Sequence, residues 1–142
     1  MLPRLELRLK DADGSHPTPF PVFDPIVSLL SPKSSAPPRP YISNVCVAAR
    51  CQRRGVARAL MAAAEYVAGP RGWGYDSAFL HVHETNGNAL DLYESSGYEE
   101  LDALHAAPLK YFYKKLSPDA PDRDEVVAAA LGTSPPVSAA RR

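Results

Sequence analysis

Arginine is dense around one glycine near the middle of the chain. Arg50, Arg53, Arg54 and Arg58 flank Gly55, and no Asp or Glu occurs from residue 26 to residue 64. An apolar run precedes this segment and a helix-forming stretch follows it. The first N–H groups of a helix lack an intrahelical acceptor and carry the positive end of the helix dipole, so a phosphate satisfies both. Because glycine has no Cβ, an anion can approach the main chain closely. The sequence therefore predicts a phosphate or pyrophosphate site at this turn.

A candidate general base lies in the segment from Ser77 to His83, where the alternation of side chains predicts a strand. One face would carry Ala78, Leu80 and Val82, and the other Phe79, His81 and His83. An unperturbed imidazole titrates near a pH of about 6.5, which suits proton transfer. We expect His81 to be the base. His83 and Glu84 are alternatives, and a strand histidine can also be a partly buried residue with a purely structural hydrogen bond.

Two motifs in this order resemble those of a known family. QRRGVA, residues 52–57, is similar to the Q/R-x-x-G-x-G/A signature of the GNAT superfamily of acetyl-CoA-dependent N-acetyltransferases. NGNALDLYESSGYEE, residues 86–100, resembles the family's N-x-x-A-x-x-x-Y-x-x-x-G-Y/F motif. The resemblance covers residues 40–116. It implies an acyl-CoA N-acyltransferase fold, acetyl-CoA as co-substrate and transfer of the acetyl group to a primary amine.

The resemblance also implies which residues bind acetyl-CoA. In the family, two neighbouring strands splay apart and the pantetheine arm pairs with the free edge of the first strand, while the pyrophosphate lies on the glycine turn. A helix-opening asparagine contacts the coenzyme, and a tyrosine on the same helix donates to its sulfur. The matching positions here are Val45, Cys46, Val47, Gln52, Arg53, Arg54, Gly55, Val56, Ala57, Arg58, Asn86, Asn88 and Tyr93.

The expected catalytic residues are Tyr93, His81 and Tyr41. Tyr93 would protonate the departing thiolate, and a backbone N–H near Val47 would polarise the thioester carbonyl. Tyr41 begins the strand before the glycine turn. Its pairing with His81 is similar to the base arrangement of protein N-terminal acetyltransferases.

Each of these residues also has a structural interpretation. Tyr93 could be a core aromatic, and one of the two asparagines is expected to cap the helix that follows. Cys51, beside the arginines, could be an activated thiolate, but we expect an inert small side chain. The strand YISNVCVAA lacks the glutamate base of many histone-type lysine acetyltransferases, which makes that specificity less favoured.

Composition narrows the class of protein. The 142 residues carry a formal net charge of zero, so only the arginine turn is polarised and nucleic-acid binding is not expected. The two cysteines, Cys46 and Cys51, are too few and too close for a disulfide scaffold, and no metal-ligating set accompanies them. No apolar run is long enough to span a membrane. We expect a soluble protein of a reducing compartment, either the cytoplasm or an organelle stroma such as the plastid's.

The pattern predicts an α/β protein with a mixed twisted sheet and helices on both faces. Strands are expected at residues 2–10, 22–30, 41–49, 77–83, 98–101 and 109–116. A helix is expected at residues 55–68, with Val56, Leu60, Ala63 and Val67 on one face, and another from Asn86 or Asn88 to Ser96. Residues 1–116 would form a single domain with its core at 40–116. Residues 117–142 would be a mobile tail with a short helical stretch at 125–131.

The front of the chain departs from the family pattern. GNAT proteins normally carry two helices before the strand that Tyr41 begins, whereas residues 1–40 contain no helix pattern. The N-terminal helices that wall the acceptor site are therefore expected to be missing or supplied by a partner. The alternative function is a non-catalytic subunit that keeps the acetyl-CoA fold and docks on a larger complex. The acceptor would be a protein N-terminus, a lysine or a small amine.

Overall fold

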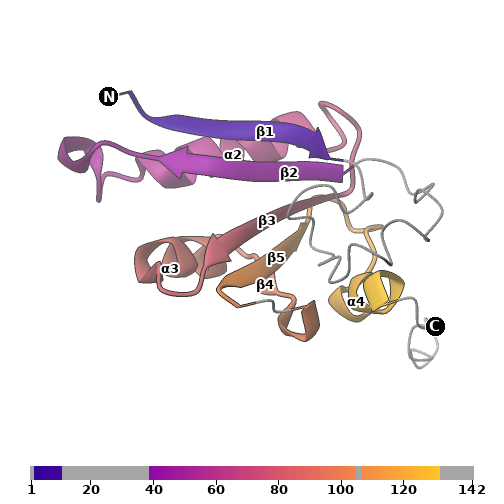
Figure 1. Cartoon of the computed structure of the whole chain (residues 1–142). Coiled ribbons are helices and arrows are strands. Elements are labelled where there is room, and N and C mark those ends of the chain that lie inside the picture. Colours follow the sequence, from indigo (N-terminus) through magenta and orange to yellow (C-terminus); the bar gives the residue numbers. More distant parts are fainter. Residues whose placement is uncertain (1, 11–38, 105–106, 132–142) are drawn as a thin grey trace.

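The computed structural model describes residues 2–10, 39–104 and 107–131. Its strands are β1 (Arg4–Lys10), β2 (Arg39–Cys46), β3 (Ser77–His83), β4 (Glu99–Glu100) and β5 (Leu109–Lys115). Its α-helices are α2 (Val56–Ala68), α3 (Gly87–Ser95) and α4 (Arg123–Leu131), and short 3-10 turns occupy Ala49–Cys51 and Asp102–Leu104. Figure 1 shows this arrangement. The predicted strand at residues 22–30 lies outside the described residues.

The five strands form one mixed sheet in the order β1-β2-β3-β5-β4. β2 and β3 run parallel, and the other neighbouring pairs are antiparallel. The parallel pair is joined by α2, as a crossover between parallel strands requires. This arrangement confirms the predicted α/β class with a mixed sheet.

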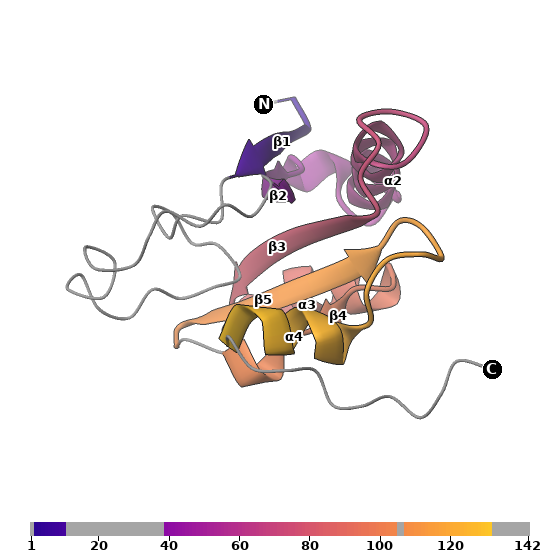
Figure 2. The ribbon, with the colours of Figure 1, turned by 90° about the vertical axis from the view of Figure 1, so that its right-hand side faces the viewer.

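Helices cover both faces of the sheet. On one face, Ile42, Leu80 and Phe112 pack with Met61 of α2 and Tyr93 of α3. On the other face, a second apolar cluster joins strand residues to α4 and the turn before β5: Tyr41, Phe79, Leu101, Leu104, Tyr111, Tyr113 and Val126. Figure 2 shows α3 and α4 on opposite sides of β5. The alternation expected in β3 is confirmed, because Ala78, Leu80 and Val82 belong to the first cluster and Phe79 to the second.

The buried face of α2 differs from the predicted one. Met61, Ala64 and Ala68 are buried, whereas the expected core residue Val67 is 41% exposed. The helix itself carries apolar side chains on most of its sides. Helical periodicity alone therefore does not determine which of its faces packs on the sheet. The small side chains of Ala64 and Ala68 let the helix lie close to the strands.

Residues 117–131 belong to the packed structure, which corrects their assignment to a tail outside the domain. Ala120 and Val126 are buried, and the Tyr113 hydroxyl donates a hydrogen bond to the Pro121 carbonyl. The nine-residue helix α4 covers aromatic residues of β5 that would otherwise face water. Residues 132–142 lie outside the described part of the chain.

Candidate active site

The glycine turn opens α2 as the sequence predicted. Arg53 and Gly55 adopt left-handed backbone conformations, with φ of 63° and 76°. The first intrahelical bond runs from the Ala59 N–H to the Gly55 carbonyl, so the N–H groups before it point out of the helix end. No acidic residue occupies the first turn. Nothing lies within 4 Å of the position where a Cβ on Gly55 would be, so the main chain is open to an approaching anion.

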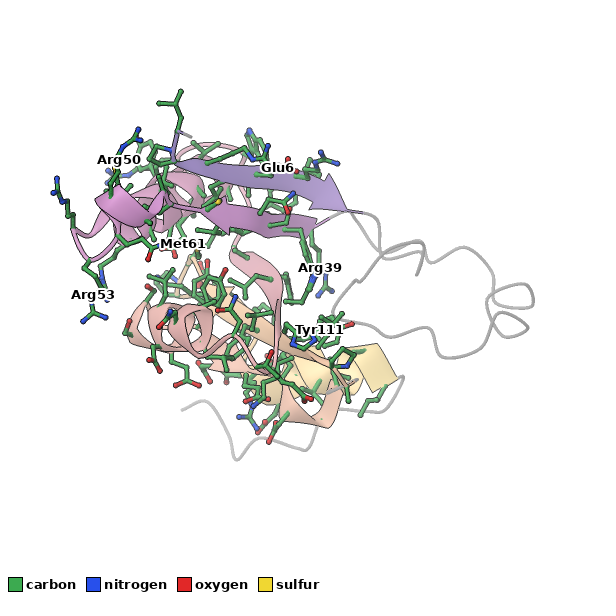
Figure 3. All side chains as sticks on the ribbon, turned by 60° about the vertical axis from the view of Figure 1, so that its left-hand side comes forward. Glu6, Arg39, Arg50, Arg53, Met61 and Tyr111 are labelled. Atoms are coloured by element: carbon green, nitrogen blue, oxygen red, sulfur yellow. The ribbon has the colours of Figure 1, made fainter. Side chains whose placement is uncertain are left out.

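A cleft of about 630 Å³ extends from this turn along α3. It is lined by Val45, Val47, Cys51, Gln52, Arg53, Gly55, Val56, Ala57, Arg58, Asn86, Asn88, Ala89, Asp91, Leu92, Tyr93 and Ser95. Most residues expected to bind the coenzyme thus meet in one concavity. Cys46 and Arg54 are not part of its lining. Arg50 and Arg53 project from the turn away from the ribbon, as Figure 3 shows.

The strands beside the cleft separate shortly after they meet. β2 and β3 pair only at Tyr41 with Phe79 and at Ile42 with Leu80. Beyond this point β2 bulges: four of its residues, 43–46, face three of β1, and Asn44 has a positive φ of 52°. In Figure 1 the two strands diverge toward their C-terminal ends. The predicted splay is therefore present, and it leaves the edge of β2 without a ladder partner on the β3 side.

Tyr93 lies on α3 at the wall of the cleft. Its side chain is buried, and its ring contacts those of Tyr98 and Phe112 at centroid distances of 6.1 and 6.4 Å. Burial raises the pKa of the Tyr93 phenol, because the phenolate would lose its hydration. The structural and the chemical interpretation of this tyrosine are thus compatible, since the side chain packs in the core and still reaches the cleft.

The Tyr41–His81 pair lies on the opposite face of the sheet from Tyr93. The Tyr41 hydroxyl shares a hydrogen bond with Nδ1 of His81, and the rings are 5.5 Å apart. Tyr111 flanks His81 at 6.2 Å. Burial, followed by the neighbouring Tyr111, raises the pKa of the Tyr41 phenol, which therefore keeps its proton at neutral pH. The sequence predicts the pairing of Tyr41 with His81. It does not predict that this pair lies on one face of the sheet and Tyr93 on the other.

The alternatives to these residues occupy the turn between β3 and α3. Nδ1 of His83 accepts hydrogen bonds from the Thr85 hydroxyl, at 2.8 Å, and from its backbone N–H, at 3.4 Å, so this histidine organises the turn. The backbone N–H of Glu84 donates to the Pro108 carbonyl. Asn86 caps α3 through its Oδ1, which accepts from the Ala89 N–H at 3.3 Å, while Asn88 lines the cleft.

Comparison with known families agrees with this geometry. The model of the acetyltransferase (GNAT) family matches residues 20–98, more than half of the chain. The chain belongs to the GNAT family.

Two curated relatives come from Arabidopsis thaliana. GCN5-related N-acetyltransferase 7, chloroplastic, is 40% identical over 73 residues, which are 51% of this chain and 26% of the relative. GCN5-related N-acetyltransferase 6, chloroplastic, is 36% identical over 59 residues, which are 42% of this chain and 20% of the relative. The chain therefore matches about a quarter or less of the length of these proteins.

Among solved structures, the chain is similar to the ribosomal-protein-S18-alanine N-acetyltransferase from Escherichia coli. The two are 23% identical with a TM-score of 0.47, over 58% of this chain and 57% of the other.

Sequence reasoning missed several residues of this GNAT cleft. Ala89, Asp91, Leu92 and Ser95 line it from α3. The helical spacing of Asn88, Asp91, Leu92 and Ser95 would have predicted a shared face. Arg58, which is expected to bind phosphate, lines the cleft and also donates to the Ser95 carbonyl and hydroxyl at 3.2 and 3.0 Å. Gln52 donates to the Val47 carbonyl at 3.0 Å and so links the glycine turn to the end of β2.

Two further properties concern only the described residues of this GNAT domain. Their His, Cys, Asp and Glu side chains form no group of three that could hold a metal ion. None of the helices in these ranges is long and apolar enough to cross a membrane.

Proposed function

We propose that the chain binds acetyl-CoA in the cleft between α2 and α3 and transfers the acetyl group to a primary amine by direct attack in a ternary complex. The observation that carries this proposal is the splay between β2 and β3. Tyr93 lies on one face of the sheet beside this splay, and the Tyr41–His81 pair lies on the other face. A thioester held in the splay would have an acid on one side and a base on the other.

The anion end of the cleft fits the coenzyme's pyrophosphate. Arg50, Arg53 and Arg54 form no ion pair with any described residue, and no acidic side chain occupies the first turn of α2. The backbone N–H groups of Val56 and Ala57 and the arginine side chains would hold the phosphates. Gln52, Arg58 and Asn88 would contribute from the cleft wall.

The pantetheine arm would lie along the open edge of β2. Val45, Cys46 and Val47 provide backbone groups there, which an extended chain can use as an added strand would. This path leads from the glycine turn toward the splay and past Tyr93. Bound acetyl-CoA supplies an activated acyl group, and the chain's own residues handle the protons.

The acceptor amine would approach from the face that carries His81. We propose that Nδ1–H of His81 donates to the Tyr41 oxygen, which leaves Nε2 to take a proton from the ammonium form of the acceptor, directly or through water. The amine nitrogen then forms a bond to the carbonyl carbon, and the Val47 N–H stabilises the oxyanion. As the carbon–sulfur bond breaks, Tyr93 gives its proton to the thiolate. The attacking nitrogen then loses its remaining extra proton, which water carries to the Tyr93 phenolate, and His81 releases its own proton to solvent.

The acceptor and the compartment are the finer parts of the proposal. The Tyr41–His81 pairing is similar to the arrangement in protein N-terminal acetyltransferases, so a protein α-amine is the acceptor class to test first, ahead of lysine and small amines. Both curated relatives are described as chloroplastic, and we propose a plastid stroma as the compartment.

The direct test measures CoA release from acetyl-CoA by the purified chain with a panel of peptides and small amines. We expect amine-dependent release well above the rate without an amine. Absence of release with every amine, by protein that binds acetyl-CoA, would contradict the catalytic proposal. That result would favour the non-catalytic subunit, which co-purification with a partner at fixed stoichiometry would support.

A further inference from the structure

The C-terminal end of α3 is held by two cations from different elements. The Arg58 guanidinium, from the first turn of α2, donates to the carbonyl and hydroxyl of Ser95 at 3.2 and 3.0 Å. The Lys114 ammonium, from β5, donates to the Ser96 carbonyl at 2.7 Å. The last carbonyls of a helix lack intrahelical donors and carry the negative end of its dipole. Both contacts therefore satisfy and stabilise this end of the helix.

Helix α2 supplies one of these cations and the ion-pair partner of the other. Arg58 belongs to it, and Glu65 accepts from Lys114 at 2.8 Å, in an ion pair whose side chains are only 16% and 26% exposed. Arg58 and Glu65 are seven residues apart, which is two helical turns, so they lie on the same side of α2. Helix α2 is therefore linked to the C-terminal end of α3 at two points, directly through Arg58 and indirectly through the Glu65–Lys114 ion pair. We call Arg58, Glu65 and Lys114 the α3 clamp.

The clamp is directly connected to Tyr93. The Lys114 ammonium lies over the Tyr98 ring, 5.5 Å from its centroid, and that ring meets the Tyr93 ring edge-on. The backbone N–H of Tyr98 donates to the Tyr93 carbonyl at 3.0 Å. Gly97, with a φ of 87°, makes the reversal that brings Tyr98 back under the helix. A displacement of the clamp would therefore move both the backbone and the ring environment of Tyr93.

The inner part of the clamp is enclosed and polar. Glu65 Oε1, Ser96 Oγ and the Tyr98 hydroxyl are buried in this region, and burial, followed by the nearby Glu65 carboxylate, raises the pKa of the Tyr98 phenol. All three residues contact Lys114, whose ammonium has three protons and two acceptors in the contacts above. Packing of α3 on an apolar sheet does not require these polar groups. Together, the Glu65 carboxylate, the Ser96 carbonyl and the Tyr98 ring hold the Lys114 ammonium in one position.

We propose that the α3 clamp positions Tyr93 in the coenzyme cleft, so that Arg58, Glu65 and Lys114 act on the leaving-group step through Tyr93. This inference rests on the proposed acetyl transfer for its functional meaning. Lys114 does not line the cleft. Its substitution is therefore expected to change proton donation by Tyr93 and to leave coenzyme binding unchanged. The structural part, that the clamp sets the position of the Tyr93 ring, does not depend on catalysis.

The test uses the full chain with ¹³C-labelled tyrosine, without coenzyme, and Tyr93→Phe assigns the Tyr93 ring signal. Arg58→Gln and Lys114→Met should each shift or split this signal. Lys114→Arg, which keeps the charge, should restore it. Arg123→Gln is the matched control, because it removes an exposed ion pair with Asp102 that has no contact with α3. An unchanged Tyr93 signal in Arg58→Gln would overturn the proposal even if Lys114→Met fails to fold.

A kinetic measurement then tests the functional part. Lys114→Met should lower kcat by about tenfold to a hundredfold, as small misplacements of a catalytic group do, with the KM for acetyl-CoA within about twofold of wild type. Lys114→Arg should recover most of kcat. Equal kcat in Lys114→Met and wild type would refute positioning of Tyr93. Lack of activity in the wild type itself would instead count against the proposed function and leave the spectroscopic result to decide the clamp.

Discussion

The Tyr41 hydroxyl and Nδ1 of His81 are joined by a hydrogen bond across the only paired part of β2 and β3, at the point where the two strands begin to separate. The tyrosine is 1% exposed and the histidine is half-buried. A buried phenol with one imidazole partner fixes the ring orientation, and with it which nitrogen is available for proton transfer.

We therefore expect His81→Gln to lower turnover by about a hundredfold or more, the usual contribution of a positioned general base. Tyr41→Phe keeps the packing and should lower turnover less, by disturbing the orientation of the imidazole. Amine-dependent CoA release checks both variants. His83→Gln is the matched control, since that histidine only organises the turn with Thr85, and it should stay within a few-fold of wild type. The proposal for His81 would be wrong if the two histidine variants had equal effects.

Tyr93→Phe should lower turnover more than it lowers affinity for acetyl-CoA. The phenylalanine preserves the ring contacts with Tyr98 and Phe112 but has no proton to give the thiolate, so the loss falls on the chemical step. Tyr66→Phe is the control, because Tyr66 is 62% exposed on the outer side of α2. Calorimetry gives the affinity and CoA release gives the rate. Unchanged turnover in Tyr93→Phe would show that Tyr93 is only a core aromatic.

Val126→Ala should destabilise the domain by about 1–3 kcal/mol, because Val126 is 2% exposed in the cluster between α4 and the sheet. Val67→Ala removes the same atoms from a side chain that is 41% exposed and should change the free energy of unfolding little. Urea unfolding of both variants checks this. Equal stabilities would mean that α4 does not contribute to the folded domain in solution.

Stability should fall at alkaline pH. Burial raises the pKa of the Tyr41, Tyr93, Tyr98, Tyr111 and Tyr113 phenols in the folded chain. Above about pH 10 the unfolded chain loses these protons while the folded chain keeps them, so the unfolded state binds fewer protons and the free energy of unfolding falls as pH rises.

A phenol contributes a slope of at most about 1.4 kcal/mol per pH unit, at pH values where it is ionised in the unfolded chain and still protonated in the folded chain. Tyr98 is the sharpest case, because both burial and the Glu65 carboxylate oppose its ionisation. From pH 9 to pH 11 the unfolded tyrosine passes from mostly protonated to mostly ionised, so Tyr98→Phe should lose about 1.4 kcal/mol less stability than wild type when unfolding is measured over this interval. A slope equal to that of wild type would contradict the inferred burial of this hydroxyl.

Much of this arrangement could be predicted from local sequence. The glycine turn, the start of α2, the alternation of β3 and the Asn86 cap each follow from a short pattern whose physical cause lies within a few residues. The two motifs were sufficient to assemble most of the cleft lining. The roles of these residues in binding and catalysis stay predictions.

What could not be predicted depends on long-range packing. Periodicity does not identify the α2 face that meets the sheet, because the helix carries apolar residues on most sides, and the choice depends on which small side chains fit the strands. The helical stretch after residue 117 has no strong amphipathic pattern of its own, and it packs because β5 leaves aromatic residues to cover. The contact of Arg58 with Ser95 joins residues 37 positions apart, and its charge alone equally fits a phosphate ligand.

The central claim is that the α2 turn binds the phosphates of acetyl-CoA. Gly55 and Gly74 form a matched pair for its test, since both have a positive φ, of 76° and 84°, and open space around the missing Cβ. Gly55→Glu and Gly74→Glu should therefore carry a similar backbone strain, about 1–2 kcal/mol, whereas only the first places bulk and negative charge at the turn. The first measurement is calorimetric titration of acetyl-CoA into both variants and the wild type. The account predicts binding by wild type and Gly74→Glu and its loss in Gly55→Glu, while equal binding by all three, or none by folded wild type, would contradict it.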